Sequence, residues 1–438
     1  MPPEPPSAAP QPPRHVLPVI VLAQLLGTSP WFAANAVMPD LQRVAGWDAQ
    51  ALGTLSAALQ LGFVAGTLVF ALLAVADRYS ARWVFCACAC GAALCTVAAA
   101  AVSSSLPLQV MWRALTGLCL AGIYPVGMKL AAQWFPRGLG AALGWLVGAL
   151  VLGSASAHAL RALGVDATAV VGTAGAVGSA GAAAEAVRLV FWAIAALCAT
   201  AGLAVVGLVP EPPRRPGASG GLQLAALASL WRDRRVRASA GGYFGHMWEL
   251  YSMWVWVPAV LATRLADTVA VSWAAFLVLG AGAVGCICGG LLVSRWGRAS
   301  QGAAPAAGGA ATKAGARVAA AQLATSGLCC LAAPWMLQAP VPVFMAWLLL
   351  WGITVAGDSP QFSALTATYA PPAAVGSLLT LVNCIGFAIS ALSIELFVRM
   401  AAALPLATVL PWLALGPLLG LWLMRPLLGS NTPAHPTY

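Results

Sequence analysis

The sequence predicts an all-α membrane protein with twelve transmembrane helices in two pseudo-symmetric six-helix bundles. Of its 438 residues, 61% are hydrophobic and only 8% are charged, whereas about 25% of the residues of a soluble protein are charged. Such a chain cannot cover a surface that faces water. Twelve segments reach the roughly 20 apolar residues that a membrane span needs. The third observation is a repeat, whose two copies lie 235 positions apart.

The repeat is carried by two short motifs that end in proline. Gly122-Ile-Tyr-Pro125 is followed by Pro136, and Gly357-Asp-Ser-Pro360 is followed by Pro371 at the same distance. A constant offset near half the chain length indicates a duplicated membrane unit. A second pair of motifs, the charged turns at 77–82 and 294–298, is 217 positions apart. An Ala/Gly-rich insertion of 18 residues at 299–316 accounts for the difference.

The first bundle is predicted in residues 16–209, after a Pro-rich, disordered tail of residues 1–15. We interpret residues 161–186, which are rich in Ala, Gly and Val, as a low-complexity outer loop, because Gly at this density disfavours a helix. The expected spans are about 16–39, 51–76, 83–103, 106–128, 139–160 and 187–209.

A linker on the cytoplasmic side, residues 210–236, separates the two bundles. Its Pro and Gly residues stop helices, and its arginine cluster can sit on anionic lipid. The second bundle, residues 237–425, precedes a tail of residues 426–438. Its expected spans are about 239–262, 269–293, 318–337, 341–364, 373–398 and 405–424.

The distribution of positive charge predicts the orientation. Of the 22 Lys and Arg residues, sixteen fall in one alternating set of connections, five fall in the other, and Arg113 lies within a span. Lys and Arg concentrate on the cytoplasmic side of a membrane, so both termini are predicted to be cytoplasmic. The net charge of +10 is thereby explained, and no nucleic-acid partner is expected. The eleven Cys residues lie in apolar spans and are interpreted as packing residues, with no metal and no cofactor.

Several motifs resemble those of the major facilitator superfamily of secondary transporters, over residues 16–425. ADRYSAR (76–82) looks like the family's charged loop between spans two and three, and SRWGR (294–298) looks like its repeat between spans eight and nine. RALTG, which begins at Arg113, is similar to the span-four arginine motif. GIYPVGMK, YFGHMWELY and DSPQFSAL resemble a bacterial branch near cyanate and nitrate/nitrite carriers. The resemblance implies a transporter and not an enzyme.

The resemblance also implies that spans one, four, seven and ten line a central cavity. Each of these spans carries polar residues at helical spacing, which a helix surrounded by lipid would not align. The stripes are Gln24, Thr28, Trp31 and Asn35; Arg113, Gly117 and Tyr124; His246, Glu249 and Met253; and Thr354, Asp358 and Gln361. From them we predict five substrate-binding residues, namely Trp31, Asn35, Arg113, Tyr124 and Gln361.

Arg113 and Glu249 are the ionisable residues of most interest, because each lies within ~6 Å of the middle of its span. The planar fork of Arg113 suits an oxyanion, so we predict a substrate clamp; the alternative is an internal ion pair with Glu249. A buried carboxyl disfavours its charged form, so Glu249 is predicted to carry a proton; the alternative is structural hydrogen bonding. His246 could relay that proton or simply pack. Asp358 could be a second titrating site or the cap of a helix break.

Charged residues at the predicted cytoplasmic ends are expected to make gating contacts: Asp77, Arg78, Arg82, Lys129 and Arg295. We therefore predict a monomeric secondary transporter that moves a small anion by alternating access, with proton symport. Two alternatives stay open. One is proton-coupled efflux of a cationic or amphipathic compound, with Glu249 and Asp358 as the cation site. The other is a ligand sensor that has a transporter fold and moves nothing.

Overall fold

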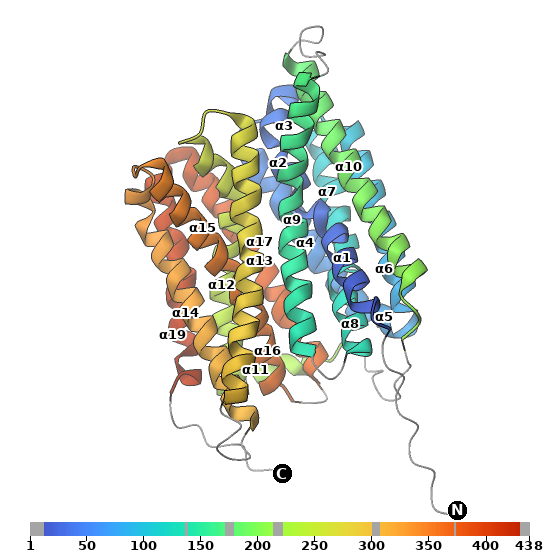
Figure 1. Cartoon of the computed structure of the whole chain (residues 1–438), viewed down its shortest axis with the longest axis vertical. Coiled ribbons are helices and arrows are strands. Elements are labelled where there is room, and N and C mark those ends of the chain that lie inside the picture. Colours follow the sequence, from blue (N-terminus) through green and yellow to red (C-terminus); the bar gives the residue numbers. More distant parts are fainter. Residues whose placement is uncertain are drawn as a thin grey trace, which may run out of the picture.

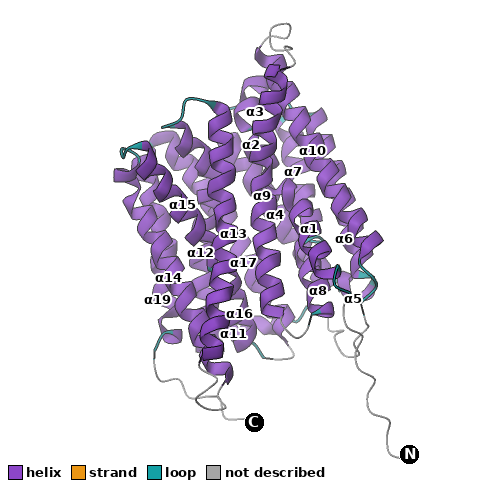
Figure 2. Ribbon diagram, in the orientation of Figure 1, coloured by secondary structure: helices purple, strands orange, loops and turns teal. Residues whose placement is uncertain are grey.

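The structure is a computed structural model, and it describes residues 13–135, 139–170, 179–212, 222–299, 307–371 and 374–429. Within these residues all regular structure is helical, and the long helices run roughly along one direction (Figures 1 and 2). The start of α1 and the end of α19 lie at one end of the bundle, which we call the terminal end. Helix α3 lies at the opposite, distal end (Figure 1).

The first half of the chain forms one side of the molecule, drawn in blue to green in Figure 1. Its first span is interrupted by a short 3-10 segment, and its fourth span is broken into two helices. The elements are α1 (Val16–Thr28), η1 (Ser29–Phe32), α2 (Ala33–Ala36), α3 (Met38–Ala45), α4 (Gln50–Leu72), α5 (Val75–Arg78), α6 (Ala81–Ala101), α7 (Leu106–Leu120), α8 (Tyr124–Trp134), α9 (Leu139–Val170) and α10 (Ser179–Leu208).

The second half forms the other side of the molecule. Its elements are η3 (Leu224–Leu227), α11 (Ala228–Arg232), α12 (Arg234–Ala262), α13 (Thr268–Ala299), α14 (Ala307–Met336), α15 (Val341–Gly357), α16 (Ser359–Tyr369), α17 (Val375–Ala403), α18 (Leu406–Val409), η6 (Leu410–Ala414), α19 (Leu415–Met424) and η7 (Arg425–Leu427).

The predicted all-α membrane fold is confirmed. In the described parts of the chain, 11 helical segments are long and apolar enough to cross a membrane. Helix α12, the expected seventh span, is not one of these segments although it has 29 residues. Its first turns carry arginines, and its middle carries His246 and Glu249. The least apolar span is therefore the one that holds two of the predicted proton-coupling residues.

Helix boundaries reproduce the sequence repeat. Helices α7 and α15 begin at positions 106 and 341, and helices α8 and α16 begin at positions 124 and 359, so both pairs differ by 235. Pro125 and Pro360 each occupy the second position of the helix that follows the break. Proline is tolerated there because the first turn of a helix does not use its N–H group. The duplicated motif therefore encodes a duplicated helix break.

The predicted outer loop at 161–186 is wrong over most of its length. Helix α9 continues to Val170 and helix α10 begins at Ser179, while residues 171–178 lie outside the described residues. Ala outnumbers Gly in this segment and has the highest helix propensity. For the same reason α14 already begins at Ala307, inside the Ala/Gly-rich insertion.

The predicted linker also contains helical residues. Helix α12 begins at Arg234, three residues before the predicted start of the second bundle. The Asp233 Oδ1 atom accepts hydrogen bonds from the backbone N–H groups of Arg235 (2.7 Å) and Val236 (3.2 Å). A side-chain cap of this kind stabilises a helix start, and it explains why the helix begins there.

The two halves pack together through α9 against α13 and α4 against α17. Helices α9 and α13 lie side by side at the centre of the view in Figure 1. Within the first half, Gly62 of α4 and Gly117 of α7 face the backbone of the opposite helix so closely that a Cβ atom would overlap it. Small residues allow such close approach between membrane helices.

Candidate functional site

A small cavity of about 30 Å³ lies between the two halves, which is about the volume of one water molecule. Helices α8 and α9 of the first half and α12, α15, α16 and α17 of the second half contribute to its wall. No lining residue is charged. The lining residues are Tyr124, Val147, Leu150, Val151, Tyr243, Met247, Leu250, Tyr251, Trp254, Ala356, Ser359 and Phe387.

The two helix breaks meet at this cavity. Tyr124 and Ser359 are the first residues of α8 and α16, and both line the cavity. Their positions differ by the repeat offset of 235. The internal duplication therefore places one residue of each broken span at the interface between the halves. A cavity at the interface between two repeats is where a transporter of this architecture binds its solute.

Six aromatic rings from both halves form a cluster beside the cavity. Trp31 and Tyr251 stack at 5.9 Å between ring centroids with an angle of 16°, and Phe63 lies 4.4 Å from Phe387. Phe32 and Trp254 complete the cluster at 5.6 Å. Aromatic pairs with these separations attract one another beyond their burial. The cluster therefore holds the two halves together at the level of the cavity.

Arg113 is buried, with 2% of its surface exposed, but it does not line the cavity. Its guanidinium donates hydrogen bonds to the backbone carbonyls of Pro30 (2.9 Å) and Trp31 (2.6 Å). Both carbonyls lie in η1, where the first span departs from α-helical geometry and carbonyl groups lose their regular partners. The Nε atom of Arg113 has no partner in the described residues.

Glu249 points into the second half and not into the cavity. Its Oε1 atom accepts hydrogen bonds from Trp351 Nε1 (2.6 Å) and Cys330 Sγ (3.2 Å), and its Oε2 atom accepts one from Ser326 Oγ (2.9 Å). These donors belong to α14 and α15. The ion pair with Arg113, which we considered as the alternative role of Arg113, is therefore wrong.

His246 and Asp358 form a fully buried pair. The Nδ1 atom of His246 lies 2.7 Å from the Oδ1 atom of Asp358. Asp358 is the residue between α15 and α16, so it lies at the helix break. The residues that follow the two partners in the chain, Met247 and Ser359, both line the cavity. The pair therefore lies directly behind the cavity wall.

The other predicted substrate-binding residues have different surroundings. Asn35 donates to Ser56 Oγ (2.8 Å) inside the first half. Gln361 is buried, and its Nε2 atom lies 3.4 Å from the position that a Cβ of Gly289 would take. Of the five predicted residues, the structure places Tyr124 in the cavity wall and Trp31 in the aromatic cluster.

The face of α12 that lines the cavity differs from the polar face that the sequence predicts. Tyr243, Met247, Tyr251 and Trp254 follow one another at intervals of four, four and three residues, which is helical spacing. The prediction of the polar face with Glu249 rests on the rule that polar residues in a span usually mark a water-filled path. The helical spacing of these four large side chains is the feature of the sequence that identifies the cavity-lining face.

The predicted gating residues lie near the terminal end of the bundle. Arg82 lies 3.5 Å from Glu211 and also donates to the backbone carbonyl of Val206, so it joins α6 to the end of α10 within the first half. Arg78 and Arg295 are exposed, and Lys129 is partly buried. The side chain of Asp77 lies outside the described residues.

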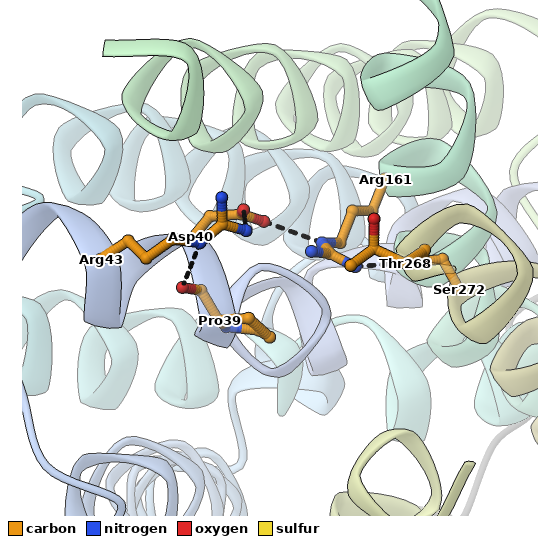
Figure 3. Close-up of polar contacts among 6 residues, drawn as sticks. All are labelled: Pro39, Asp40, Arg43, Arg161, Thr268 and Ser272. Atoms are coloured by element: carbon orange, nitrogen blue, oxygen red, sulfur yellow. Dashed lines mark hydrogen bonds and ion pairs between the residues drawn. The ribbon is translucent and has the colours of Figure 1, made fainter. Parts of the chain in front are cut away.

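A buried polar network joins the two halves at the distal end (Figure 3). The carboxylate of Asp40 on α3 lies 2.6 Å from Arg43 and 2.8 Å from the Nε atom of Arg161 on α9. The Nη1 atom of Arg161 donates to Ser272 Oγ on α13 at 2.8 Å. Ser272 in turn donates to the backbone carbonyl of Thr268. Arg161 thus connects an acid of the first half to a hydroxyl of the second half.

The network closes the distal end of the interface between α9 and α13. Asp40 and Arg161 are only 2% and 3% exposed, so the pair is shielded from solvent. The network is therefore a buried polar contact between the two halves at the distal end.

A family model described as Major Facilitator Superfamily matches residues 20–394. A search of curated proteins gave no match. Among solved structures, the chain is similar to the proton:xylose symporter XylE, with 15% identity, a TM-score of 0.68, and coverage of 94% of this chain and 96% of that one.

Two further solved structures are similar over almost the whole chain. One is a bacterial homologue of the human lysosomal transporter Spinster, with 14% identity, a TM-score of 0.65, and coverage of 94% and 95%. The other is the human organic anion transporter MFSD10, with 16% identity, a TM-score of 0.64, and coverage of 95% and 100%. At these identities the similarity establishes the fold.

Proposed function

The chain belongs to the major facilitator superfamily, and from this premise we propose that it is a proton-coupled secondary transporter of a small solute. The protein is a multi-pass integral membrane protein and a transporter, not an enzyme. We further propose that the protein is a monomer in a bacterial inner membrane and that both of its termini are cytoplasmic. The two halves would rock about the central cavity. The concentration of Lys and Arg in one alternating set of connections supports the cytoplasmic location of both termini.

The observation that carries proton coupling is the buried pair of His246 and Asp358 behind the cavity wall. The Oδ2 atom of Asp358 has no partner in the described residues, so it can accept a proton without losing a hydrogen bond. Glu249, in contrast, already accepts bonds from three donors. We therefore assign the transported proton to the Asp358–His246 pair and assign to Glu249 a supporting role in the same half.

The test uses purified protein in liposomes that contain a pH-sensitive dye. A panel of carboxylates, pentoses, nucleosides and aromatic alcohols is added outside, and proton movement is recorded with and without an imposed pH gradient. We expect at least one class to move protons only when the protein is present. Asp358→Asn should abolish this movement yet retain exchange of labelled solute. Asp267→Asn is the control, because Asp267 caps the exposed start of α13 and Asn preserves a cap.

Solute transport that is the same with and without a pH gradient would refute proton coupling. A wild-type level of proton movement in Asp358→Asn would refute the assignment of the site. Proton movement in the direction opposite to that of the solute would identify exchange in place of symport.

A second candidate is transport of an anion that binds Arg113, in line with the resemblance to cyanate and nitrate/nitrite carriers. One observation favours it, which is the unpartnered Nε atom of Arg113. MFSD10 is an organic anion transporter. In this hypothesis an anion would approach Arg113 when the halves open. Arg113→Lys, which retains the charge but loses the planar fork, should then weaken anion binding, whereas an unchanged affinity would exclude the clamp.

A further inference from the structure

We propose that the central cavity, once separation of the two halves has enlarged it beyond its volume of about 30 Å³, selects an uncharged solute that combines an aromatic ring with a hydrogen-bonding group. This inference rests on the proposed transport function and specifies the class of its substrate. It starts from the cavity wall, where five of the 12 lining residues are aromatic and none is charged. The wall therefore offers ring faces and apolar surface on most sides.

Three tyrosines give this wall its polar character. Tyr243 and Tyr251 are 5% and 3% exposed, and Tyr124 faces them from the first half. None of the hydrogen bonds made among the described residues uses a hydroxyl of these three residues. These three residues line the cavity, so their unpartnered hydroxyls are suited to bind a ligand that supplies a donor or acceptor.

The hydroxyls come from both halves of the protein. Tyr124 is the first residue of α8, after the break in the fourth span, and Tyr243 and Tyr251 lie two turns apart on one face of α12. Ser359, the repeat counterpart of Tyr124, adds a fourth hydroxyl-bearing residue. A solute that hydrogen-bonds to Tyr124 and to α12 at once would favour approach of the two halves around it.

Charge is disfavoured in this cavity because no charged residue lines its wall and the nearby ionisable side chains point toward partners elsewhere. Asp358 is paired with His246, Glu249 accepts bonds from α14 and α15, and Arg113 donates to the carbonyls of η1. An ion in the cavity would lose its hydration without gaining a counter-charge, which is strongly unfavourable. A neutral solute does not incur this penalty.

A ring on the solute is favoured by the aromatic residues of the wall. Tyr251, Trp254 and Phe387 line the cavity and pack on one another, with centroids 5.3 Å apart for Tyr251 and Phe387 and 5.6 Å apart for Tyr251 and Trp254. Trp31 stacks behind Tyr251 and fixes the orientation of its ring. The faces and edges of such a preformed group favour another aromatic ring over a saturated one.

The test is a matched set of four probes with one two-ring skeleton: naphthylethanol, naphthylacetate, naphthylethylammonium and the saturated decalin analogue of the alcohol. Binding to detergent-solubilised protein is measured by calorimetry. We expect naphthylethanol to bind best, with both ionic probes at least about 10-fold weaker and the decalin alcohol roughly 2- to 12-fold weaker. Tyr124→Phe, Tyr243→Phe and Tyr251→Phe should each weaken naphthylethanol roughly 2- to 12-fold.

Tyr369→Phe is the control, because Tyr369 lies at the end of α16 under Arg235 and outside the cavity. Its affinity for naphthylethanol should equal that of the wild-type protein. The proposal is overturned if an ionic probe binds as tightly as naphthylethanol, if no probe binds, or if all three cavity variants bind like the control. The probe series on wild-type protein decides the question even if a variant does not fold.

Transport is measured separately with the same probes in proteoliposomes. Preferred binding of naphthylethanol without its transport would contradict the proposed function and leave the selectivity of the cavity intact. Transport of naphthylacetate with no preference for naphthylethanol would support the proposed transport function. It would contradict the proposal that the solute is uncharged.

Discussion

Ser272→Ala should shift the protein toward a conformation that is open at the distal end. The substitution removes the hydroxyl that accepts a hydrogen bond from Arg161 across the interface between the halves, at 2.8 Å. It leaves the ion pair of Arg161 with Asp40 in place. The variant therefore isolates the contact between halves from the contacts within the first half.

The size of the effect follows from the charge on the donor. A hydrogen bond to a charged group contributes roughly 1.5–3 kcal/mol, which corresponds to a change of roughly 10- to 150-fold in an equilibrium constant. The bond exists only while α9 and α13 are in contact at the distal end. Its loss should therefore act almost entirely on the equilibrium between closed and open conformations.

Distances between spin labels at Ala49 and Ala266 provide the assay. Both residues are exposed near the distal end, one in each half. Ketone-bearing amino acids at these positions allow labelling without removal of the eleven native Cys residues. We expect a longer distance to become more populated in Ser272→Ala. The matched control is Ser156→Ala on α9, where the hydroxyl donates only to the carbonyl of Gly153 in its own helix.

An identical distance distribution in Ser272→Ala and Ser156→Ala would refute the reasoning. Arg161→Lys is a second variant for the same distance measurement, because a single ammonium group cannot reproduce the geometry of the guanidinium fork. It should shift the distribution in the same direction as Ser272→Ala.

Three other predictions concern stability, measured by thermal unfolding in detergent. Trp351→Phe removes the donor 2.6 Å from Glu249 and should lower the free energy of unfolding by roughly 1.5–3 kcal/mol. The control is Trp335→Phe, at a 70% exposed position, which should have little effect. Equal effects of the two substitutions would exclude a structural role for the bond between Trp351 and Glu249. Gly117→Ala places a Cβ atom against the backbone of α4 and should prevent normal folding, in contrast to Gly207→Ala, whose Cβ meets open space. Arg113→Lys cannot reproduce both bonds to the carbonyls of η1 and should cost roughly 1.5–3 kcal/mol relative to Arg425→Lys at an exposed end.

The family resemblance predicted which spans contribute to the centre of the molecule, but neither it nor the helical spacing of polar residues predicted how each span is rotated. Glu249 lies on α12, as expected from the sequence, yet it faces α14 and α15. The rotation of a membrane helix is determined by packing against its neighbours, and a single sequence does not contain that information. Tyr124, which the polar stripe of its span singled out, lines the cavity because the helix break fixes its position along the span and at the interface; its role in substrate binding stays a prediction.

The distal network shows a second limit of sequence reasoning. Asp40 and Arg161 are 121 residues apart, and Ser272 lies in the other half of the chain. The predicted outer loop at 161–186 includes Arg161, and a charge in such a loop needs no partner. Once α9 extends beyond that position, the same charge is buried and requires an acid. An error in one helix boundary thus concealed a buried ion pair.

The helix break at 357–360 connects the two proposals. Asp358 carries the proposed proton site and Ser359 lines the proposed solute site, so two neighbouring residues of one irregular segment serve both ligands. Coupling between two ligands requires a structural element whose arrangement both of them bias. A solute that draws Ser359 toward Tyr124 would also move the backbone that holds Asp358 against His246. Proton binding and solute binding would then be linked through the orientation of this break, without any direct contact between proton and solute.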